Sequence, residues 1–401
     1  MIRHHRTDRA ASLHDRVRGC LLGGALGDQL GSGVEFLSLE EIRRRFGAAG
    51  VTGPSPAYGR EAGRVTDDTQ MTLFVAEGLV RAEAVRRERS AAADPLVPLA
   101  HAHLRWLHTQ GAVAASVERG RVDGRIPSGD GPSAEPIVSG WLVTETWLHQ
   151  ARAPGRTCLS GLRALPRDPP VPARNGSKGC GGVMRVAPVG LARPPHAGPA
   201  ALAYDIAGLT HGHPTGRIAA AGLAQIVSEV LAGRDFAEAI ASASNVLRRW
   251  PGHEETLDAI DLAVVLARRS RTAGGPAPEA IEELLGGGWI AEEAIGIALC
   301  CAMIAEAGVE AGTAPDEAFR AGALRAVNHS GDSDSTGAIF GNLAGARFGD
   351  TALPPDWVSD LEGRATIEAV AADLAAAFAP GWEEREPEID EAIDPGRYPP
   401  W

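Results

Sequence analysis

Two clusters of adjacent acidic residues lie far apart in the chain, and each comes at the start of a predicted helix. The first is Thr-Asp-Asp-Thr at residues 66–69, and the second is Gly-Asp-Ser-Asp-Ser-Thr at residues 331–336. Like charges this close repel one another, so folding them together is unfavourable unless a cation or protons neutralise them. Mg²⁺, Mn²⁺ and Ca²⁺ prefer carboxylate and hydroxyl oxygens. If the fold joins the clusters, their acids and hydroxyls could surround one or two divalent cations and support a metal-assisted reaction.

Helix capping is the alternative explanation for each cluster. Asp, Ser and Thr cap helix N-termini and match the positive end of the helix dipole. A cap uses one acceptor, however, whereas each cluster offers three or four. Two such clusters in one chain therefore favour a metal site over capping alone.

A glycine-rich stretch comes before the first acidic cluster. Its glycines are Gly23, Gly24, Gly27, Gly31 and Gly33. Each glycine inside a helix costs about 1 kcal/mol relative to alanine, so we expect another helix or a ligand to approach this segment closely. Glu35 follows the last of these glycines. It is either a solvated loop carboxylate or part of a site.

Two further segments could contact an anionic ligand. The glycine loop from Gly179 to Gly182 can present backbone N–H groups to an anion, although a turn without a ligand is the alternative. Lys178 and Arg185 flank this loop and could attract a phosphate. His211 and His213 give a weak metal signal, because oxygen-rich clusters need no imidazole. We expect them to contact a ligand instead, since they come before a helix N-terminus.

Helical periodicity dominates the chain, and the alternating apolar and polar residues typical of β-strands are scarce. Apolar residues recur at helical spacing in residues 17–30, 68–88, 96–108, 137–150, 199–210, 215–232, 235–249, 255–271, 290–306, 315–327, 336–347 and 364–379. No fixed-period repeat is visible, so a solenoid is not expected. The pattern predicts an all-α protein.

Composition limits the classes of protein to which the chain can belong. With 401 residues, 44% hydrophobic and 22% charged, it is typical of a soluble globular protein. The formal net charge of −12 argues against a nucleic-acid backbone as the main ligand. The five cysteines include no C-x-x-C pair, so we expect no disulfide framework, no zinc site and a reducing cytoplasm. We expect no secretory signal and no membrane span, because no apolar run approaches ~20 residues.

Stretches rich in glycine and proline interrupt the helical pattern at residues 115–136, 152–183 and 272–288. The first and the last are predicted to be surface loops. None is predicted to be a domain linker, because the two acidic clusters lie on opposite sides of all three. The predicted boundaries are one domain over residues 1–401, a core at about 15–379, loop insertions at about 115–175 and 272–288, and an irregular tail at 380–401.

Five motifs in order make the chain resemble the ADP-ribosylglycohydrolase family, which includes the dinitrogenase reductase-activating glycohydrolases. The motifs are G-D-x-x-G-x-x-x-E at Gly27 to Glu35, T-D-D-T at Thr66 to Thr69, the glycine loop leading into Met184-Arg185, T-H at Thr210-His211, and G-D-x-D-[ST] at Gly331 to Ser335. A single D-x-D is common by chance, whereas five motifs in this order are specific. The resemblance covers the chain from about Val17 to about Gly349.

The resemblance implies an all-α, compact orthogonal bundle that holds two divalent cations, Mg²⁺ or Mn²⁺. The implied metal ligands are Thr66, Asp67, Asp68, Asp332, Asp334 and Ser335. Glu35 takes the place of an acidic residue near the scissile bond, and the implied catalytic set is Glu35, Asp67, Asp68 and Asp334. The implied substrate contacts are Lys178, Gly179, Cys180, Gly181, Gly182, Met184 and His211, with the glycine loop on the diphosphate and the histidine near the ADP-ribose.

Two positions depart from the family pattern. The family's glycine loop often carries Asn where this chain has Cys180, which removes an amide donor and acceptor. Many members have Thr where this chain has Ser335, and serine keeps the hydroxyl. We therefore expect metal binding to survive and the substrate preference of the loop to differ.

The first functional hypothesis is a hydrolase that uses metal-activated water. It would cleave the bond from the anomeric carbon of ADP-ribose to a protein side chain, a nucleobase or a small molecule, and would release ADP-ribose. We expect this protein to be a monomer. The second hypothesis is a non-catalytic ADP-ribose-binding or structural protein on the same fold, which has no need of four acids around metals. The third is a two-metal phosphatase.

Overall fold

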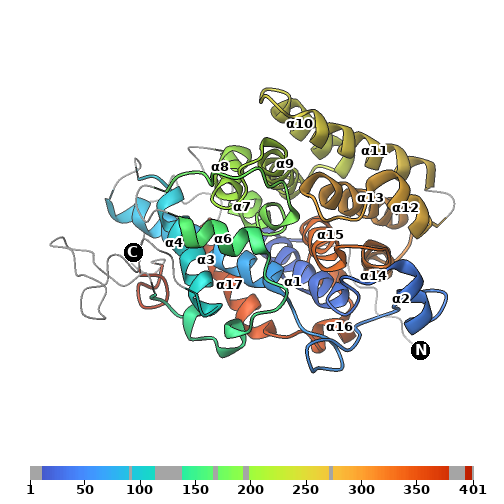
Figure 1. Ribbon diagram of the computed structural model, residues 1–401, viewed down its shortest axis with the longest axis horizontal. Helices are drawn as coiled ribbons and strands as arrows, with labels where there is room; N and C mark the ends of the chain where they lie inside the picture. The colour runs from blue at the N-terminus through green and yellow to red at the C-terminus, as the bar shows by residue number, and fades with distance from the viewer. Residues whose placement is uncertain are drawn as a thin grey trace.

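The computed structural model shows a protein built from helices (Figure 1). It describes residues 11–89, 93–112, 138–165, 170–192, 198–270, 274–378 and 393–399. Within these ranges the regular elements are α-helices and 3-10 turns, with two isolated β-bridges and no β-strand. None of the helices described is long and apolar enough to cross a membrane. The all-α prediction is confirmed.

The helices follow one another closely along the chain. The α-helices are α1 Leu13–Gly31, α2 Leu39–Phe46, α3 Asp67–Arg89, α4 Leu96–Thr109, α6 Arg156–Ala164, α7 Ala187–Ala192, α8 Gly198–Gly208, α9 Pro214–Leu231, α10 Phe236–Leu247, α11 Glu254–Ser270, α12 Pro278–Leu285, α13 Ala291–Glu310, α14 Pro315–Val327, α15 Ser333–Phe348, α16 Pro355–Ser359 and α17 Arg364–Ala377. The 3-10 turns are η1 Leu142–Thr144, η2 Thr146–His149, η3 Cys180–Gly182 and η4 Asp350–Ala352.

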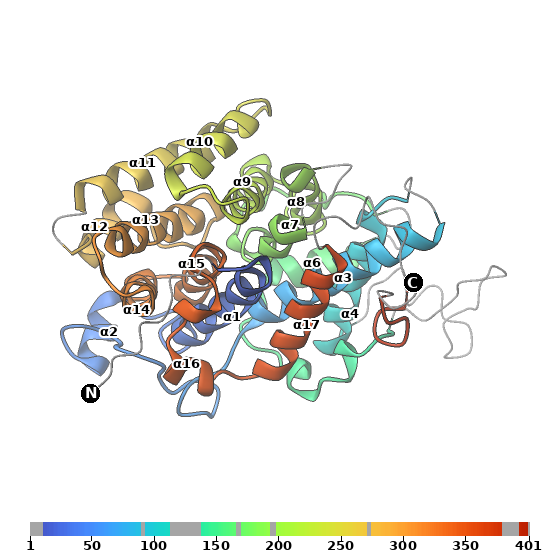
Figure 2. The same ribbon diagram turned by 180° about the vertical axis from the view of Figure 1, so that it is seen from behind.

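Helices α1 and α15 pack backbone against backbone in the middle of the molecule (Figures 1 and 2). The contact face of each helix has a glycine at every fourth position: Gly19, Gly23, Gly27 and Gly31 on α1, and Gly337, Gly341 and Gly345 on α15. A methyl group added at Gly27 would lie 1.9 Å from the Gly337 carbonyl oxygen. Backbones this close can make Cα–H···O contacts that side chains would prevent. The prediction that a helix approaches the glycine-rich stretch is confirmed.

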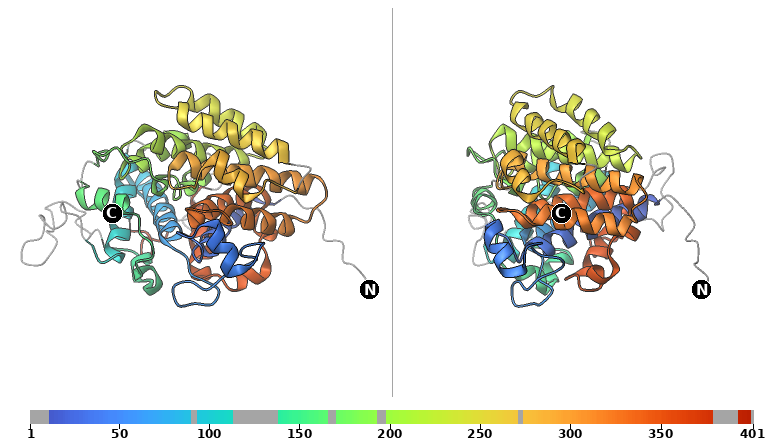
Figure 3. Two further views of the ribbon diagram at one scale, coloured as in Figure 1. Left: turned by 45° about the vertical axis from the view of Figure 1, so that its right-hand side comes forward. Right: turned by 90° about the vertical axis from the view of Figure 1, so that its right-hand side faces the viewer.

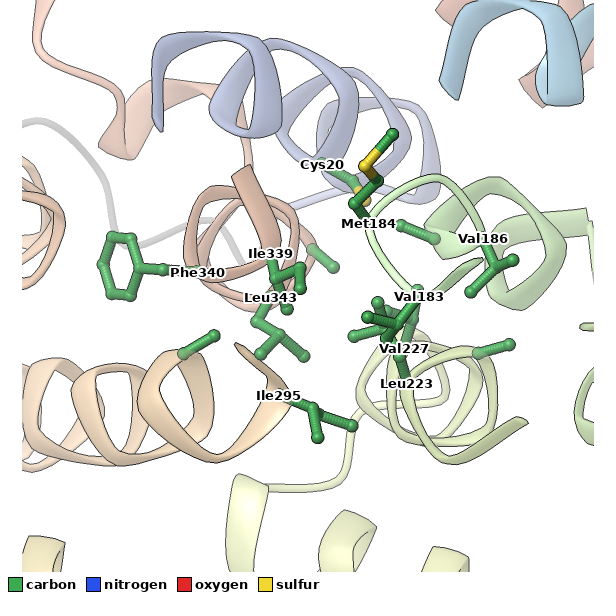
Figure 4. Packing of buried hydrophobic residues seen from close by; sticks show 14 of the residues in the cluster. Cys20, Val183, Met184, Val186, Leu223, Val227, Ile295, Ile339, Phe340 and Leu343 are labelled. Carbon is green, nitrogen blue, oxygen red and sulfur yellow. The ribbon is translucent and has the colours of Figure 1, made fainter. Parts of the chain in front are cut away.

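The other helices enclose this central pair. Helix α17 packs against α1 and α3 (Figure 2), while α10 and α11 form an outer edge over α9 and α13 (Figure 3). Figure 4 shows Ile339 and Leu343 of α15 pointing into a shared core with Leu223 of α9 and Ile295 of α13. All four side chains are fully buried. This core fixes the position of α15, whose first turn carries the second acidic cluster.

Capping residues explain where several helices begin. Ser12 accepts a hydrogen bond from the Asp15 backbone N–H, and the Asp15 carboxylate accepts one from the Ser12 N–H, which makes a capping box for α1. The same arrangement starts α2 at Ser38. Helix α2 was not predicted, although its S-x-x-E spacing is the sequence signature of such a start.

The helix predicted near residues 137–150 is wrong. In the described part of that range, the chain forms only the turns η1 and η2. Gly140 is in the left-handed region with a φ of 88°, and Glu145 is extended with a ψ of 104°. The apolar spacing arises because Leu142 and Leu148 both reach the core from separate turns.

Two stretches predicted to be irregular contain helices. Helix α6 lies in the 115–175 insertion and α12 lies in the 272–288 insertion, so the latter is not a plain surface loop. In α12, Pro278 starts the helix, and Ile281 and Leu285 are buried one turn apart. The 115–136 loop and residues 380–392 lie outside the described residues.

Residues 393–399 of the tail are described and are packed on the protein. Tyr398 is buried, and its hydroxyl donates a hydrogen bond to Asp373 Oδ2 at 2.7 Å. Arg397 lies over the ring of Trp141, with 4.3 Å from its guanidinium carbon to the ring centre. This part of the tail is therefore attached to α17 and to the segment before η1.

Candidate metal centre

The fold brings the two acidic clusters together. Residues 66–68 lie at the start of α3, and residues 332–335 lie at the start of α15. Burial is the largest cause of raised pKa values at Asp28, Glu35, Asp67, Asp68 and Asp332, and the charge of Asp334 adds to the increase at each of them. These carboxyl groups come from three parts of the chain, so the charge of Asp334 reaches all three. Ligand atoms of Glu35, Asp332 and Asp334 all lie within 4.8 Å of one another. The glycine-lined contact faces of α1 and α15, called the glycine face below, pack these two helices directly against each other. The loop that follows α1 and carries Glu35 therefore reaches the second acidic cluster at the start of α15.

The clustered carboxyl groups are removed from water. Asp67 and Asp68 are each 3% exposed, and Asp334 is 2% exposed. Burial is the largest cause of the raised pKa values of Asp67, Asp68 and Asp332, and mutual repulsion adds to it. Burial, followed by the charges of Asp334 and Asp332, raises the pKa of Glu35 to about 11. Without a cation, the pKa values of Asp67, Asp68, Asp332 and Glu35 therefore all lie above the normal range of carboxylic acids.

Two carboxylate oxygens in the cluster have no hydrogen-bond partner, Asp68 Oδ1 and Glu35 Oε2. A buried polar atom without a partner is unfavourable by about 1–3 kcal/mol, and by more when it is charged. A divalent cation would neutralise the cluster and would satisfy such oxygens. The residues present therefore fit a divalent cation.

Asp28 lies in the cluster, although it was not among the site residues predicted from the sequence. Its carboxylate accepts hydrogen bonds from the backbone N–H groups of Thr66 at 2.9 Å and Thr69 at 3.0 Å, and from both of their hydroxyls. Burial and the charge of Asp334 raise its pKa to about 7. Asp28 thus holds the first acidic cluster in place from α1. The G-D pair of the first motif was the available signal.

The hydroxyl groups predicted as ligands both lie in the cluster. Thr66 Oγ1 donates to Asp28 Oδ1 at 2.9 Å and lies 3.4 Å from Asp68 Oδ2. Ser335 Oγ lies 3.8 Å from the sulfur of Met184, which places that predicted substrate contact beside the second cluster. Direct binding of a cation by these hydroxyls stays a prediction.

Backbone strain is concentrated around the cluster. Among the described residues, the non-glycine residues with positive φ are Phe36 at 65°, Tyr58 at 49° and Ala153 at 48°. Phe36 follows Glu35 in the chain. Tyr58 also lies near the cluster: burial is the largest cause of its raised pKa, and the charge of Glu35 is the next largest. Ala153 comes shortly before Gly155, whose N–H donates to Asp67 Oδ2 at 3.2 Å. Each such residue costs about 1–3 kcal/mol, and strain of this kind gathers at functional sites.

An exposed aromatic pair stands beside Glu35 and the second cluster. The rings of Phe36 and Trp289 are stacked with centres 5.3 Å apart, although the two residues are 65% and 43% exposed. Trp289 follows Gly288, which lies against Asp332 and Thr336. Exposed rings at this position can contact a ligand that enters the centre.

The glycine loop lies next to the second cluster and over His211. Methyl groups added at Gly181 and Gly182 would lie 3.2 Å and 3.4 Å from the His211 ring. Burial, followed by the charge of Arg185, lowers the pKa of His211 to about 3, so the ring is neutral. Its Nδ1 lies 2.8 Å from Thr210 Oγ1. The structure therefore places the glycine loop against His211. Contact of these residues with a substrate stays a prediction.

The two positively charged side chains that were expected to attract a phosphate, Lys178 and Arg185, are already ion-paired or buried. The Lys178 ammonium forms ion pairs with Glu255, at 2.8 Å, and with Glu292. These two carboxylates neutralise much of the charge of Lys178. Substrate contact by Lys178 stays a prediction. Arg185 is fully buried and donates to Thr210 Oγ1 at 2.7 Å, so the expectation that it attracts phosphate is wrong. His213 caps α9, because its Nδ1 accepts from the Thr215 N–H at 3.2 Å.

The chain is similar to known proteins over most of its length. The family model described as ADP-ribosylglycohydrolase matches residues 9–384. The chain is 24% identical over 358 residues to the ADP-ribosyl-[dinitrogen reductase] glycohydrolase of Rhodospirillum rubrum, covering 88% of this chain and 92% of that protein. It is 26% identical over 383 residues to the ADP-ribosylarginine hydrolase Tri1 of Pseudomonas putida, covering 94% and 80%. A solved structure described as an ADP-ribosylglycohydrolase-related protein complex matches with a TM-score of 0.54 and 25% identity, covering 91% of this chain and 99% of that one. The chain belongs to the ADP-ribosylglycohydrolase family.

Proposed function

We propose that this protein is a divalent-cation-dependent hydrolase that cleaves the glycosidic bond between ADP-ribose and an acceptor. The proposed ligands of two cations, Mg²⁺ or Mn²⁺, are Thr66, Asp67, Asp68, Asp332, Asp334 and Ser335. The observation that carries the proposal is the buried group of carboxylates with two oxygens lacking partners. A binding protein without catalysis has no use for such an unfavourable cluster.

The cations, when bound, would polarise a water molecule and orient the ribose hydroxyls. Glu35 stands at the edge of the cluster with one oxygen free of hydrogen bonds, so it can hold or move a proton at the acceptor oxygen or nitrogen. The transition state of such a reaction resembles an oxocarbenium ion, which the surrounding carboxylates would stabilise.

The glycine loop is proposed to hold the diphosphate. The Cys180 N–H donates to the Trp289 carbonyl at 3.1 Å, so contacts with the anion would fall to Gly181 and Gly182. His211 beneath the loop is neutral, so its ring positions the loop and adds no positive charge. Phe36 and Trp289 would shield the reacting bond from bulk water.

The test is a turnover panel over differently linked ADP-ribose substrates. The names of two relatives refer to an ADP-ribosylated reductase and to ADP-ribosylarginine, so the panel includes arginine-, serine- and nucleobase-linked ADP-ribose. Release of free ADP-ribose in the presence of a divalent cation supports the proposal. Release of inorganic phosphate indicates the two-metal phosphatase, and binding without turnover indicates the non-catalytic alternative.

Glu35→Gln is expected to lower turnover on the order of 10²-fold or more while leaving ADP-ribose affinity nearly unchanged. Glutamine keeps the shape of the side chain but cannot accept a proton. The measurements are hydrolysis at saturating substrate and calorimetric binding of ADP-ribose. Wild-type turnover and wild-type ADP-ribose affinity in the variant would show that Glu35 has no role in the reaction. Lost ADP-ribose binding with an unchanged rate per bound substrate would show that Glu35 positions the ligand.

Mg²⁺ or Mn²⁺ is expected to raise the Tm, and a chelator is expected to abolish activity reversibly. Without a cation, folded Asp28 keeps its proton up to about pH 7, whereas the unfolded chain loses it near 3.8. The Tm of the metal-free protein should therefore fall as pH rises through that window, and the increase caused by metal should grow. Thermal melts at several pH values check this, and a Tm that saturating metal leaves unchanged at every pH would contradict it.

A further inference from the structure

A large cavity lies outside the metal centre, where α14 and α16 face the loop between α2 and α3 (Figure 1). Its volume is about 610 Å³, and ligand pockets typically measure ~300–1,000 Å³. Of the described residues that line it, none belongs to the two acidic clusters. The proposed reaction therefore leaves this cavity without a role.

The cavity has an apolar floor and an acidic rim. Trp357 is 3% exposed and forms part of the floor, whereas Glu61, Asp356 and Asp360 are exposed at the edge. Arg320 is the only basic side chain among the described residues that line the cavity. Three carboxylates and one guanidinium leave two negative charges, so the cavity favours a positively charged ligand.

One guanidinium of the protein already lies at this site. The guanidinium carbon of Arg320 is 4.4 Å from the centre of the Trp357 ring, and Arg320 Nη2 donates to Asp356 Oδ1 at 2.6 Å. An aromatic face and a carboxylate both attract cations. In the part of the chain that the structure describes, the carboxylates of Glu61 and Asp360 have neither an ion pair nor a hydrogen bond. They are therefore available to a second cation that comes from outside.

The wall of the cavity is preorganised but contains one unsatisfied group. The Val51 N–H donates to Asn328 Oδ1 at 2.8 Å, and Asn328 Nδ2 donates to the Val51 carbonyl at 2.9 Å. Gln29 of α1 donates to the Asp360 carbonyl at 3.2 Å. Ser55 in the same wall is 5% exposed, and its Oγ is buried without a hydrogen-bond partner. Such a group is unfavourable, and a polar ligand in the cavity can satisfy it.

The loop that forms this wall continues to the metal centre. A methyl group added at Gly33 would lie 2.4 Å from Ser55 Oγ, and Gly33 comes two residues before Glu35. Three residues after Ser55, Tyr58 interacts with the charge of Glu35. Because a chain spans at most about 3.6 Å per residue, Ser55 and Tyr58 are at most about 11 Å apart. A bound peptide therefore needs only a few residues to reach from one site to the other.

We propose that this cavity binds a lysine or arginine side chain of an ADP-ribosylated protein substrate, located a few residues from the modified position. The cationic group would pair with Glu61 and Asp360, while its methylene groups would pack on the apolar floor. The inference rests on the proposed function, because it identifies the acceptor as a protein. A nucleobase or a free amino acid as the acceptor carries no such neighbour and would not use the cavity.

The test compares two ADP-ribosylated peptides that carry the linkage found to turn over in the substrate panel. One peptide has lysines on both sides of the modified residue, and the other has glutamines at the same positions. An exposed ion pair changes affinity by up to about fivefold, so wild type should favour the lysine peptide by roughly 5- to 20-fold in kcat/KM. The difference should lie mainly in KM, since these contacts hold the ground state and the transition state equally.

Glu61→Gln/Asp360→Asn should abolish this preference, because it removes both carboxylates and keeps the size of each side chain. Asp258→Asn/Asp261→Asn is the matched control, since it removes two exposed acids of α11 and gives the same net charge. The control should keep the preference for the lysine peptide.

Gly53→Arg is a second cavity variant, which supplies a cation from the protein itself. A Cβ at Gly53 has one neighbour within 4 Å, Trp357 Nε1 at 3.6 Å, so the arginine has room beside the ring. This variant should also lose the preference, and thermal melts check that every variant is folded.

A preference that survives in either cavity variant overturns the inference. Equal loss in the α11 control also overturns it, because net charge alone would then attract the peptide. Equal hydrolysis of the two peptides by wild type, or turnover confined to nucleobase-linked ADP-ribose, overturns the inference and leaves the proposed function standing. Failure to hydrolyse any ADP-ribose linkage overturns both.

Discussion

Asp334→Asn is expected to abolish hydrolysis while leaving the protein folded and at least as stable without metal. Asp334 is the carboxylate whose charge reaches every other acid in the cluster. Asparagine keeps its size and removes the charge, so repulsion in the metal-free protein falls. The same change removes a proposed cation ligand. We expect turnover to drop on the order of 10³-fold, which corresponds to about 4 kcal/mol of transition-state stabilisation.

The measurements are hydrolysis and thermal melts with and without Mg²⁺. The increase in Tm caused by metal should disappear in Asp334→Asn, and the metal-free Tm should stay level or rise. Asp316→Asn is the matched control, because Asp316 also lies in the first turn of a helix, α14, away from the cluster. It should keep wild-type turnover and the wild-type response to metal. Wild-type turnover in Asp334→Asn would show that the acidic cluster is not the catalytic centre.

Gly27→Ala is expected to destabilise the protein by about 3 kcal/mol or more. The added methyl group would lie 1.9 Å from the Gly337 carbonyl oxygen and 2.3 Å from its carbon. Backbone on both sides cannot yield as a flexible side chain can, so the overpacking exceeds the ~1 kcal/mol that alanine gains in helix propensity. Because Asp28 is the next residue, the displaced helix should also weaken metal binding.

Gly308→Ala is the matched control for this prediction. Gly308 lies in α13, and a methyl group there would have its nearest neighbour, Thr313 Oγ1, at 3.6 Å. This variant should be as stable as wild type or up to about 1 kcal/mol more stable. The free energy of unfolding is measured with urea, and the slope is checked for two-state behaviour. Equal free energies of unfolding for the two variants would show that α1 and α15 can move apart without loss of stability.

Features that depend on residues close together in the chain could be predicted from the sequence. Long helices with regular apolar spacing were predicted within a few residues of their observed ends. The acidic clusters stood out because each is continuous in the chain, and the glycine spacing predicted a close helix contact. These signals are local, and the fold uses them directly.

Other features depend on contacts between distant segments. Asp28 is important because of Thr66 and Thr69, and nothing near it in the chain indicates that pairing. Helices α6 and α12 are short and lie among prolines and glycines, so their buried pairs were hidden by the surrounding composition. The strain at Phe36 and Tyr58 arises only after tertiary packing. Neither residue type predicts a positive φ.

The glycine face has a consequence for the synthesis of the protein. The Asn342 side chain donates to the Cys20 carbonyl at 2.8 Å, and these two residues are 322 positions apart. Helix α1 therefore leaves the ribosome with a glycine-rich, weakly helical sequence whose partner has not yet been made. It must wait, unpaired, for nearly the whole chain to emerge, and contacts so distant form slowly. Acquisition of metal would then mark the completion of folding, and a chain that ends before α15 would have no centre to fill.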